Sequence, residues 1–184
     1  KTAIYSSTAA RFETLAAEFG LPFVCKEPRS SSGLGVFLIK SPEDFSMYQT
    51  GSSTVYVQEY LEIDRDLRVV IIGDNVVTAY WRVKPPGAFH NNVSRGGMID
   101  RTGIPGPVVD EVAYVSRRLG IDYAGFDVAV TGTGVFLLEF NQFFGTRGIQ
   151  RNSVDLGKKI YRYLLSNALN TPTTTCRLSS SKAS

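Results

Sequence analysis

A predicted β-hairpin in the C-terminal half constrains the fold more than any other segment of these 184 residues. Its strands are Tyr123–Val130 and Val135–Asn141, joined around Gly132 and Gly134. In both strands apolar side chains alternate with polar or small ones, which predicts one face in a core and one face outside it. The outer face carries the polar side chains of the hairpin, which are Asp127, Glu139 and Asn141.

The register of this hairpin decides what its polar side chains can do. Both apolar faces share one core only if the numbers of paired residues have an even sum, as when Asp127 lies opposite Glu139. This register requires an odd-length loop or a bulge, and the glycines allow either. Facing carboxylates repel each other unless a cation lies between them, and all-oxygen ligands suit Mg²⁺. The alternative is a solvated outer face of an amphipathic hairpin.

A second segment has the order strand, Ser/Gly loop, strand. The apolar run 21–25 ends in Lys26, the loop spans Ser30–Gly35, and the apolar run Val36–Ile39 follows. Small residues let backbone N–H groups approach phosphate oxygens, and Lys26 supplies a positive charge beside them. The loop is neither a Walker A motif nor a Rossmann turn, because a strand follows it where those motifs have a helix. Such a loop is also typical of a mobile surface turn.

Further strands and one long polar segment lie between these two motifs. Val55–Leu61 is rich in β-formers, and Asp66–Val77 reads as strand, tight turn, strand. The polar, glycine-rich segment Phe89–Gly97 is too long for a simple turn, and such loops are often functional.

In this order the segments resemble the ATP-grasp superfamily, and most closely its RimK-like branch of ligases that add glutamate to a protein carboxyl terminus. The likeness runs from about residue 1 to 169. The matching positions are Lys26, Ser30–Gly35, Gln58–Leu61, Asp66–Arg68, Arg82, Asn92, Arg95–Gly97, Asp127 and Glu139–Asn141.

The resemblance implies an α+β ATP-grasp fold, in which two α+β subdomains with antiparallel sheets and flanking helices enclose a nucleotide cleft. The expected division is an N-terminal subdomain at 1–60 with the phosphate loop, and a C-terminal subdomain at 61–170 with the metal site. A disordered Ser/Thr-rich tail is expected at 171–184. The resemblance also implies a domain before residue 1, since relatives carry one.

The resemblance also implies roles for individual residues. Lys26 would contact the α- and β-phosphates, Glu59 would help to read adenine, and Asp66 would lie near the ribose. The expected nucleotide-binding residues are Lys26, Ser31, Ser32, Gly33, Glu59, Tyr60, Leu61, Asp66 and His90. The expected catalytic residues are Arg68, Arg82, Asn92 and Arg95. One or two Mg²⁺ ions, with Mn²⁺ as an alternative, would be held by Asp127, Glu139 and Asn141.

Several of these residues have alternative interpretations. Lys26 can simply extend to solvent, and Asn92 can cap a turn. Glu59 and Asp66 can be surface acids, paired with Arg65 or Arg68 in the case of Asp66. Stacking of Arg82 on Trp81 is as well supported as its role in the site.

Two departures from the family pattern concern the substrates. His90 stands where relatives usually have arginine, which weakens one expected phosphate contact. Phe143 and Phe144 follow Asn141 where relatives have small residues, which leaves the acceptor open.

Composition agrees with a folded chain. Hydrophobic residues make up 43% of the chain, the net charge is only +3, and no dense Lys/Arg block indicates nucleic acid as a partner. Neither Cys25 nor Cys176 has metal-like spacing, which favours a reduced cytoplasmic setting. No apolar run predicts a membrane span. Helices are predicted at 11–19, 42–49, 108–119 and 155–169.

The function predicted from these features is ATP- and Mg²⁺-dependent ligation of a carboxylate to an amine through an acyl phosphate. The amine would belong to an amino acid or to a peptide or protein terminus, and the protein is a possible homo-oligomer. The alternatives are a non-catalytic ATP-binding module and an ATP-dependent small-molecule kinase on the same fold.

Overall fold

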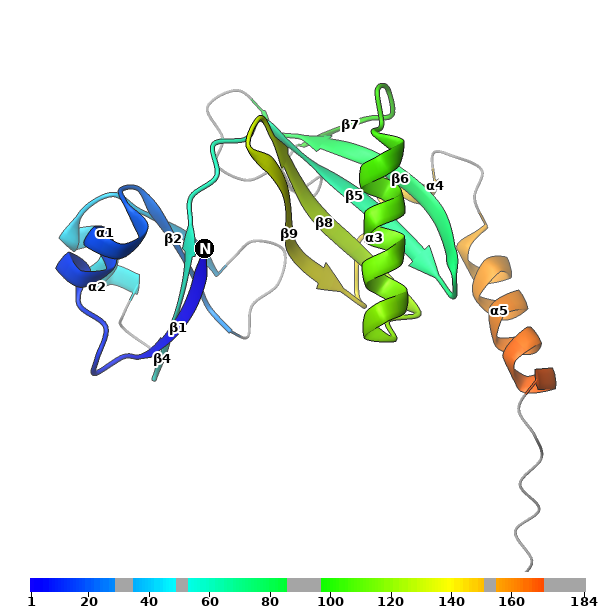
Figure 1. The fold of residues 1–184 in the computed structure, drawn as a ribbon, viewed down its shortest axis with the longest axis horizontal. Helices are drawn as coiled ribbons and strands as arrows, with labels where there is room; N and C mark the ends of the chain where they lie inside the picture. The colour runs from blue at the N-terminus through cyan, green and yellow to red at the C-terminus, as the bar shows by residue number, and fades with distance from the viewer. Residues whose placement is uncertain (29–34, 49–52, 86–96, 151–154, 171–184) are drawn as a thin grey trace, which may run out of the picture.

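The computed structural model describes residues 1–28, 35–48, 53–85, 97–150 and 155–170. It contains two antiparallel sheets, and each forms a lobe with its own helices (Figure 1). The last strand of the first sheet ends at Glu59, and the first strand of the second begins at Arg65. The predicted boundary near residue 60 therefore falls between the two sheets, and the proposed subdomain limits remain a prediction.

The first sheet has the strand order β1-β4-β2-β3. Its strands are β1 (Thr2–Ser6), β2 (Phe23–Lys26), β3 (Val36–Ile39) and β4 (Thr54–Glu59). Helices α1 (Phe12–Phe19) and α2 (Pro42–Tyr48) pack on it. Aromatic rings from strand and helix, such as Phe23 and Phe45 with centroids 6.2 Å apart, fill this core. Both helices were predicted within one residue at each end, whereas β1 was not predicted.

The second sheet has the strand order β7-β6-β5-β8-β9. Its strands are β5 (Arg65–Ile72), β6 (Asn75–Val83), β7 (Met98–Asp100), β8 (Tyr123–Thr131) and β9 (Gly134–Asn141). Helix α3 (Gly106–Leu119) covers one face and ends at Gly120, whose φ of 65° favours glycine. Leu67, Trp81 and Phe126 belong to the core beneath α3. The short helix α4 (Arg147–Gln150) follows β9 in the chain.

Helix α5 (Leu156–Asn170) packs loosely on the end of the second sheet farther from the first lobe (Figure 1). The predicted apolar stripe is only partly buried, because Leu164 is 59% exposed. Tyr163 attaches the helix, since its hydroxyl donates to Asp122 at 2.7 Å and its ring lies against Gly73. Within the described ranges, no helix is both long and apolar enough to cross a membrane.

The β8–β9 hairpin has the predicted pairing of Asp127 with Glu139. The strands pair Thr131 with Gly134 at the turn, so the loop between them is even, and a bulge between Asp127 and Val128 corrects the register. The bulge lies in the middle of the hairpin, away from the glycines. It leaves Leu138 without a partner in the ladder, so the strict alternation predicted for this strand is wrong.

Candidate nucleotide and phosphate site

The sheet face opposite α3 carries a cluster of four buried charged side chains. Asp66 and Arg68 are on β5, Arg82 is on β6 and Asp127 is on β8, and each is at most 7% exposed. Their neighbours in sequence enter the core beneath α3, so strand alternation sends the charged side chains to the other face. Because isolated charges are costly to bury, such a group persists only when its members pair.

Asp127 is the centre of this charged cluster. Arg68 forms a two-pronged pair with it, in which Nε donates to Oδ1 and Nη2 donates to Oδ2 at 2.9 Å. A terminal nitrogen of Arg82 lies 2.7 Å from the same Oδ2. The register supports these contacts, because Arg68 and Asp127 lie directly opposite each other. With Asp127 only 2% exposed, the alternative of a solvated outer face is wrong for this residue.

Asp66 forms the second fork, with Arg82. The two residues are direct partners in the β5–β6 ladder, and the Nε of Arg82 donates to Oδ1 of Asp66 at 2.8 Å. Burial raises the pKa of Asp66, and the hydrogen bonds and charge of Arg82 oppose that rise. Burial alone would lower the pKa of Arg82, but the carboxylates of Asp127 and Asp66 outweigh it and raise the pKa. Arg82 therefore remains cationic at every pH at which the fold exists.

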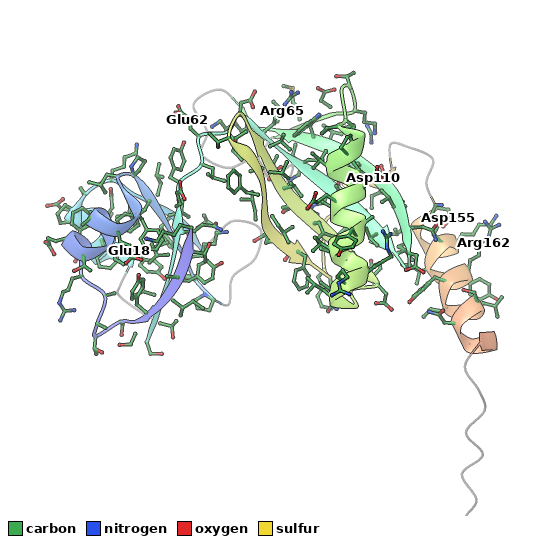
Figure 2. All side chains as sticks on the ribbon, in the orientation of Figure 1. Glu18, Glu62, Arg65, Asp110, Asp155 and Arg162 are labelled. Atoms are coloured by element: carbon green, nitrogen blue, oxygen red, sulfur yellow. The ribbon has the colours of Figure 1, made fainter. Side chains whose placement is uncertain are left out.

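These contacts replace two alternatives weighed from the sequence. Arg82 does not stack on Trp81; Arg65, labelled in Figure 2, takes that place with its guanidinium carbon 4.4 Å from the ring centroid. The acid Asp66 pairs with Arg82 rather than with Arg65 or Arg68. Strand alternation explains both results, because Arg82 and Asp66 share one face while Trp81 faces the core under α3.

Glu139 and Asn141 lie beside this cluster on the edge strand β9. Glu139 is exposed and lies opposite Asp127, while Asn141 lies opposite Gly125 and donates to Glu139 Oε1 at 2.8 Å. The Asn141 side chain can therefore turn its oxygen away from Glu139. Two carboxylates and an amide oxygen on one sheet face match the ligand chemistry of Mg²⁺. Among the described residues no group of three or more His, Cys, Asp or Glu side chains is placed to hold a metal.

Lys26 links the first sheet to this cluster. It is the last residue of β2, and its ammonium lies 6.0 Å from the Tyr56 ring centroid. Burial lowers the pKa of Lys26, while the charges of Glu139 and Asp127 oppose that shift. Because those carboxylates act on the ammonium, Lys26 lies within electrostatic range of the β8–β9 hairpin although β2 belongs to the other sheet. Lys26 is half-buried here and does not simply extend to solvent.

The predicted adenine-reading residues lie between the two sheets. Glu59 ends β4, is exposed, and has its carboxylate 2.9 Å from the amino group of Lys1. Tyr60 and Leu61 follow it and are half-buried. Their position agrees with a hinge, and their contact with adenine stays a prediction. The remaining predicted residues, which are Ser31, Ser32, Gly33, His90, Asn92 and Arg95, lie outside the described residues.

Sequence reasoning missed the aromatic side chain that packs over the charged cluster. The ring of Phe144 lies over the Arg68 guanidinium, 5.9 Å from centroid to carbon, and 5.4 Å from the Tyr123 centroid. The lack of a side chain at Gly125 makes room for it, because a Cβ there would lie 3.0 Å from both Phe144 and Arg68. The unusual Phe143-Phe144 pair was the available signal, and the structure gives its members different environments: Phe143 is fully exposed.

Sequence reasoning also missed the packing of Arg101, Tyr80 and Gly148. Arg101 has its guanidinium carbon 5.9 Å from the Tyr80 ring centroid and donates to the carbonyl of Gly148 on α4. A Cβ at Gly148 would overlap the Tyr80 ring at 2.2 Å, so this position requires glycine for packing reasons. Burial raises the pKa of Tyr80, and the charges of Arg68 and Arg82 oppose that shift. No sequence motif signals this packing, because it depends on a glycine in a short helix far from β6.

Comparison with known proteins agrees with this arrangement. The model of the RimK-like ATP-grasp domain matches residues 2–164. The ribosomal protein bS6–L-glutamate ligase of Escherichia coli O81 (strain ED1a) is 29% identical over 153 residues, which are 79% of this chain and 51% of that protein. The chain thus spans about half the length of the curated relatives it matches.

Two solved structures show the same fold. A RimK domain ATP-grasp protein from Sphaerobacter thermophilus aligns with a TM-score of 0.67 at 20% identity, covering 89% of this chain and 60% of that one. The ATP-grasp ligase PsnB, solved with a precursor variant, Mg and ADP, aligns with a TM-score of 0.64 at 19% identity, covering 91% and 53%. The expected α+β ATP-grasp fold is therefore confirmed. With a family model matching nearly its whole described length, this chain belongs to the RimK-like ATP-grasp family.

Proposed function

We propose that this chain forms the nucleotide-binding and phosphoryl-transfer part of an ATP- and Mg²⁺-dependent ligase that joins a carboxylate to an amine. The observation that carries the proposal is the buried cluster of Arg68, Arg82 and Asp127 on the second sheet, with Lys26 of the first sheet within electrostatic range of Asp127 and Glu139. Cations and carboxylates from two lobes are gathered at one place, as binding of a metal-bound triphosphate requires.

The reaction explains why this site needs cations and no covalent nucleophile. A carboxylate oxygen is a poor leaving group, and its conversion to an acyl phosphate supplies a better one, which an amine then displaces. Phosphoryl transfer depends mainly on positioning and on neutralising charge on the phosphate oxygens. We assign Lys26 to the α- and β-phosphates, and Arg68 and Arg82 to the phosphate end and the reacting carboxylate. Their burial strengthens these interactions, because little water competes with them.

The metal ligands in this proposal are Asp127, Glu139 and Asn141. Mg²⁺, or Mn²⁺ with the same oxygen ligands, would supply positive charge to the phosphate oxygens when bound. Glu139 is exposed and accessible, whereas Asp127 is held by Arg68 and Arg82. Those two arginines must share Asp127 with the metal or release it when the phosphates arrive.

The acceptor that we propose is the amine of an amino acid or of a peptide or protein terminus. Relatives are named as L-glutamate ligases of a ribosomal protein, and PsnB was solved with a peptide precursor. Phe143 is fully exposed and precedes Phe144, whose ring lies over Arg68, and the identity of the acceptor amine is left to the screen below. A cytoplasmic location with ATP supply, and assembly into a homo-oligomer, belong to the same proposal.

Calorimetric titration of the chain with ATP, with and without Mg²⁺, tests the site. We expect metal-dependent binding in the wild type and its loss in Glu139→Gln, which removes a ligand charge while leaving an exposed side chain of equal size. If the wild type does not bind ATP in the presence of Mg²⁺, the proposed site is wrong. If Glu139→Gln binds Mg·ATP as well as the wild type does, the assignment of Glu139 as a metal ligand is wrong.

Product analysis then separates the ligase from the alternatives. Acceptor-dependent release of ADP and phosphate supports the ligase, whereas nucleotide binding without turnover indicates a non-catalytic module. A stable phosphorylated product, detected by mass spectrometry, indicates a kinase. A screen of candidate amines and carboxylates identifies the substrates.

A further inference from the structure

Asp66 was expected near the ribose, and in the structure its side chain is buried against Arg82. It is 5% exposed, and both of its oxygens accept hydrogen bonds from Arg82. The pair is a direct cross-strand pair between β5 and β6, so backbone register and side-chain geometry select the same partner. Because the carboxylate is buried and both of its oxygens already accept from Arg82, little of it is accessible to a sugar hydroxyl in this arrangement.

Arg82 is in turn divided between two carboxylates. Its Nε and one terminal nitrogen bind Asp66, and that same terminal nitrogen lies 2.7 Å from Oδ2 of Asp127. A guanidinium has five N–H donors in a rigid plane. Within the described part of the chain no contact uses the second terminal nitrogen of Arg82, and its two donors are free in that sense.

The fork with Asp66 fixes the direction of those donors. Without Asp66, Arg82 would pair with Asp127 alone and would compete there with Arg68, which already binds both Asp127 oxygens. The Arg82 plane would then rotate, and its free donors would point elsewhere. Asp66 also balances the group, since two carboxylates face two guanidiniums.

We propose that Asp66 is a positioning residue, which holds Arg82 so that its free donors face the terminal phosphate of the bound nucleotide. This inference rests on the proposed function, because that function places Arg82 at the phosphate end of the site. Asp66 itself touches no substrate and acts only through Arg82.

The test compares two nucleotides that differ at the terminal phosphate, Mg·ADP and Mg·AMPPNP, and requires no knowledge of the acceptor. The quantity measured by calorimetry is the Kd of Mg·ADP divided by the Kd of Mg·AMPPNP. This ratio reports how much the γ-phosphate contributes to affinity. Asp66→Asn keeps the size of the side chain but removes its charge and one acceptor. We expect this variant to lower the ratio by about tenfold, the size of one charge-assisted hydrogen bond, with Mg·ADP affinity changed less than about threefold.

A double-mutant cycle shows whether Asp66 acts through Arg82. In an Arg82→Gln background, adding Asp66→Asn should change the ratio by less than about twofold, because the side chain that Asp66 orients is already absent. Asp64→Asn is the matched control, since Asp64 is exposed two residues earlier and should leave the ratio unchanged. If Asp66→Asn fails to fold, Asp66→Glu keeps the charge, displaces the fork and should lower the ratio in the same direction.

Three results would overturn the inference. They are an unchanged ratio in Asp66→Asn, an equal loss of affinity for both nucleotides, and additive effects of Asp66 and Arg82. Each leaves the proposed function intact as long as the wild type binds the Mg-nucleotides. Failure of the wild type to bind either nucleotide would instead contradict the proposed function itself.

Discussion

Replacing Asp127 by asparagine should destabilise the fold by about 3–5 kcal/mol, the cost of removing one partner from a buried ion pair. The Asp127 side chain is 3% exposed, and the side chains of its partners Arg68 and Arg82 are 7% and 9% exposed. Water therefore cannot solvate the two guanidiniums once the carboxylate charge is removed. At an effective dielectric constant of about 20, opposite charges about 4 Å apart attract by about 4 kcal/mol, which is the same size. After the substitution two guanidiniums face one carboxylate, that of Asp66.

Urea unfolding followed by tryptophan fluorescence measures this loss. Trp81 is the only tryptophan, is 4% exposed and belongs to the core of the second sheet, so it reports unfolding of the sheet that holds the cluster. For a protein of this size, each kcal/mol lowers Tm by about 2–4 °C, which gives an expected decrease of about 6–20 °C.

Glu139→Gln is the matched control, because it changes the carboxylate directly opposite Asp127 but at an exposed position. Its effect on stability should stay within about 0.5 kcal/mol, as for surface substitutions. Arg68→Gln combined with Asp127→Asn should recover part of the loss, because the pair is then removed as a unit. A loss below about 1 kcal/mol for Asp127→Asn alone would refute the buried cluster as the source of stability.

Two titratable groups give the remaining predictions. Because burial lowers the pKa of Lys26 below 10.5, its charge is lost at a lower pH than usual, and Mg·ADP affinity should already fall as pH rises toward 10.5. Lys26→Arg, which stays cationic, should show a flatter calorimetric profile, and equal profiles would contradict the role of Lys26. Cys25 is fully buried, and burial raises the pKa of its thiol to about 12. In a Cys176→Ser background this thiol should therefore resist alkylation at pH 8 and react only when the protein unfolds. Rapid labelling of the native protein would contradict this and show that β2 is accessible.

Local pattern was sufficient for much of the fold and part of the site. Helix limits followed from apolar spacing and from terminators such as Gly120, and the pairing of Asp127 with Glu139 followed from the requirement that both strands share one core. These features depend on neighbours in sequence or on one hairpin. Strand β1 was not predicted because it becomes a strand by pairing with β4, about fifty residues away in the sequence.

The partners of the charged side chains depend on geometry that no local pattern contains. A strand pattern shows that Asp66, Arg68 and Asp127 leave the core, but not that β5 lies between β6 and β8, which brings two arginines onto one carboxylate. The mid-strand bulge could not be predicted from local pattern either. It is needed only because the turn pairs Thr131 with Gly134, and the sequence alone does not show that pairing. A strictly regular hairpin with that turn would place Leu138 opposite Asp127 and would move Glu139 to the other face. The bulge is therefore what brings the exposed carboxylate to the buried one in this sequence. Deleting Leu138 removes the extra residue and still leaves Glu139 opposite Asp127, so metal-dependent nucleotide binding should survive this deletion. Loss of binding by a variant whose sheet still forms would contradict the argument that this pairing is what the site requires.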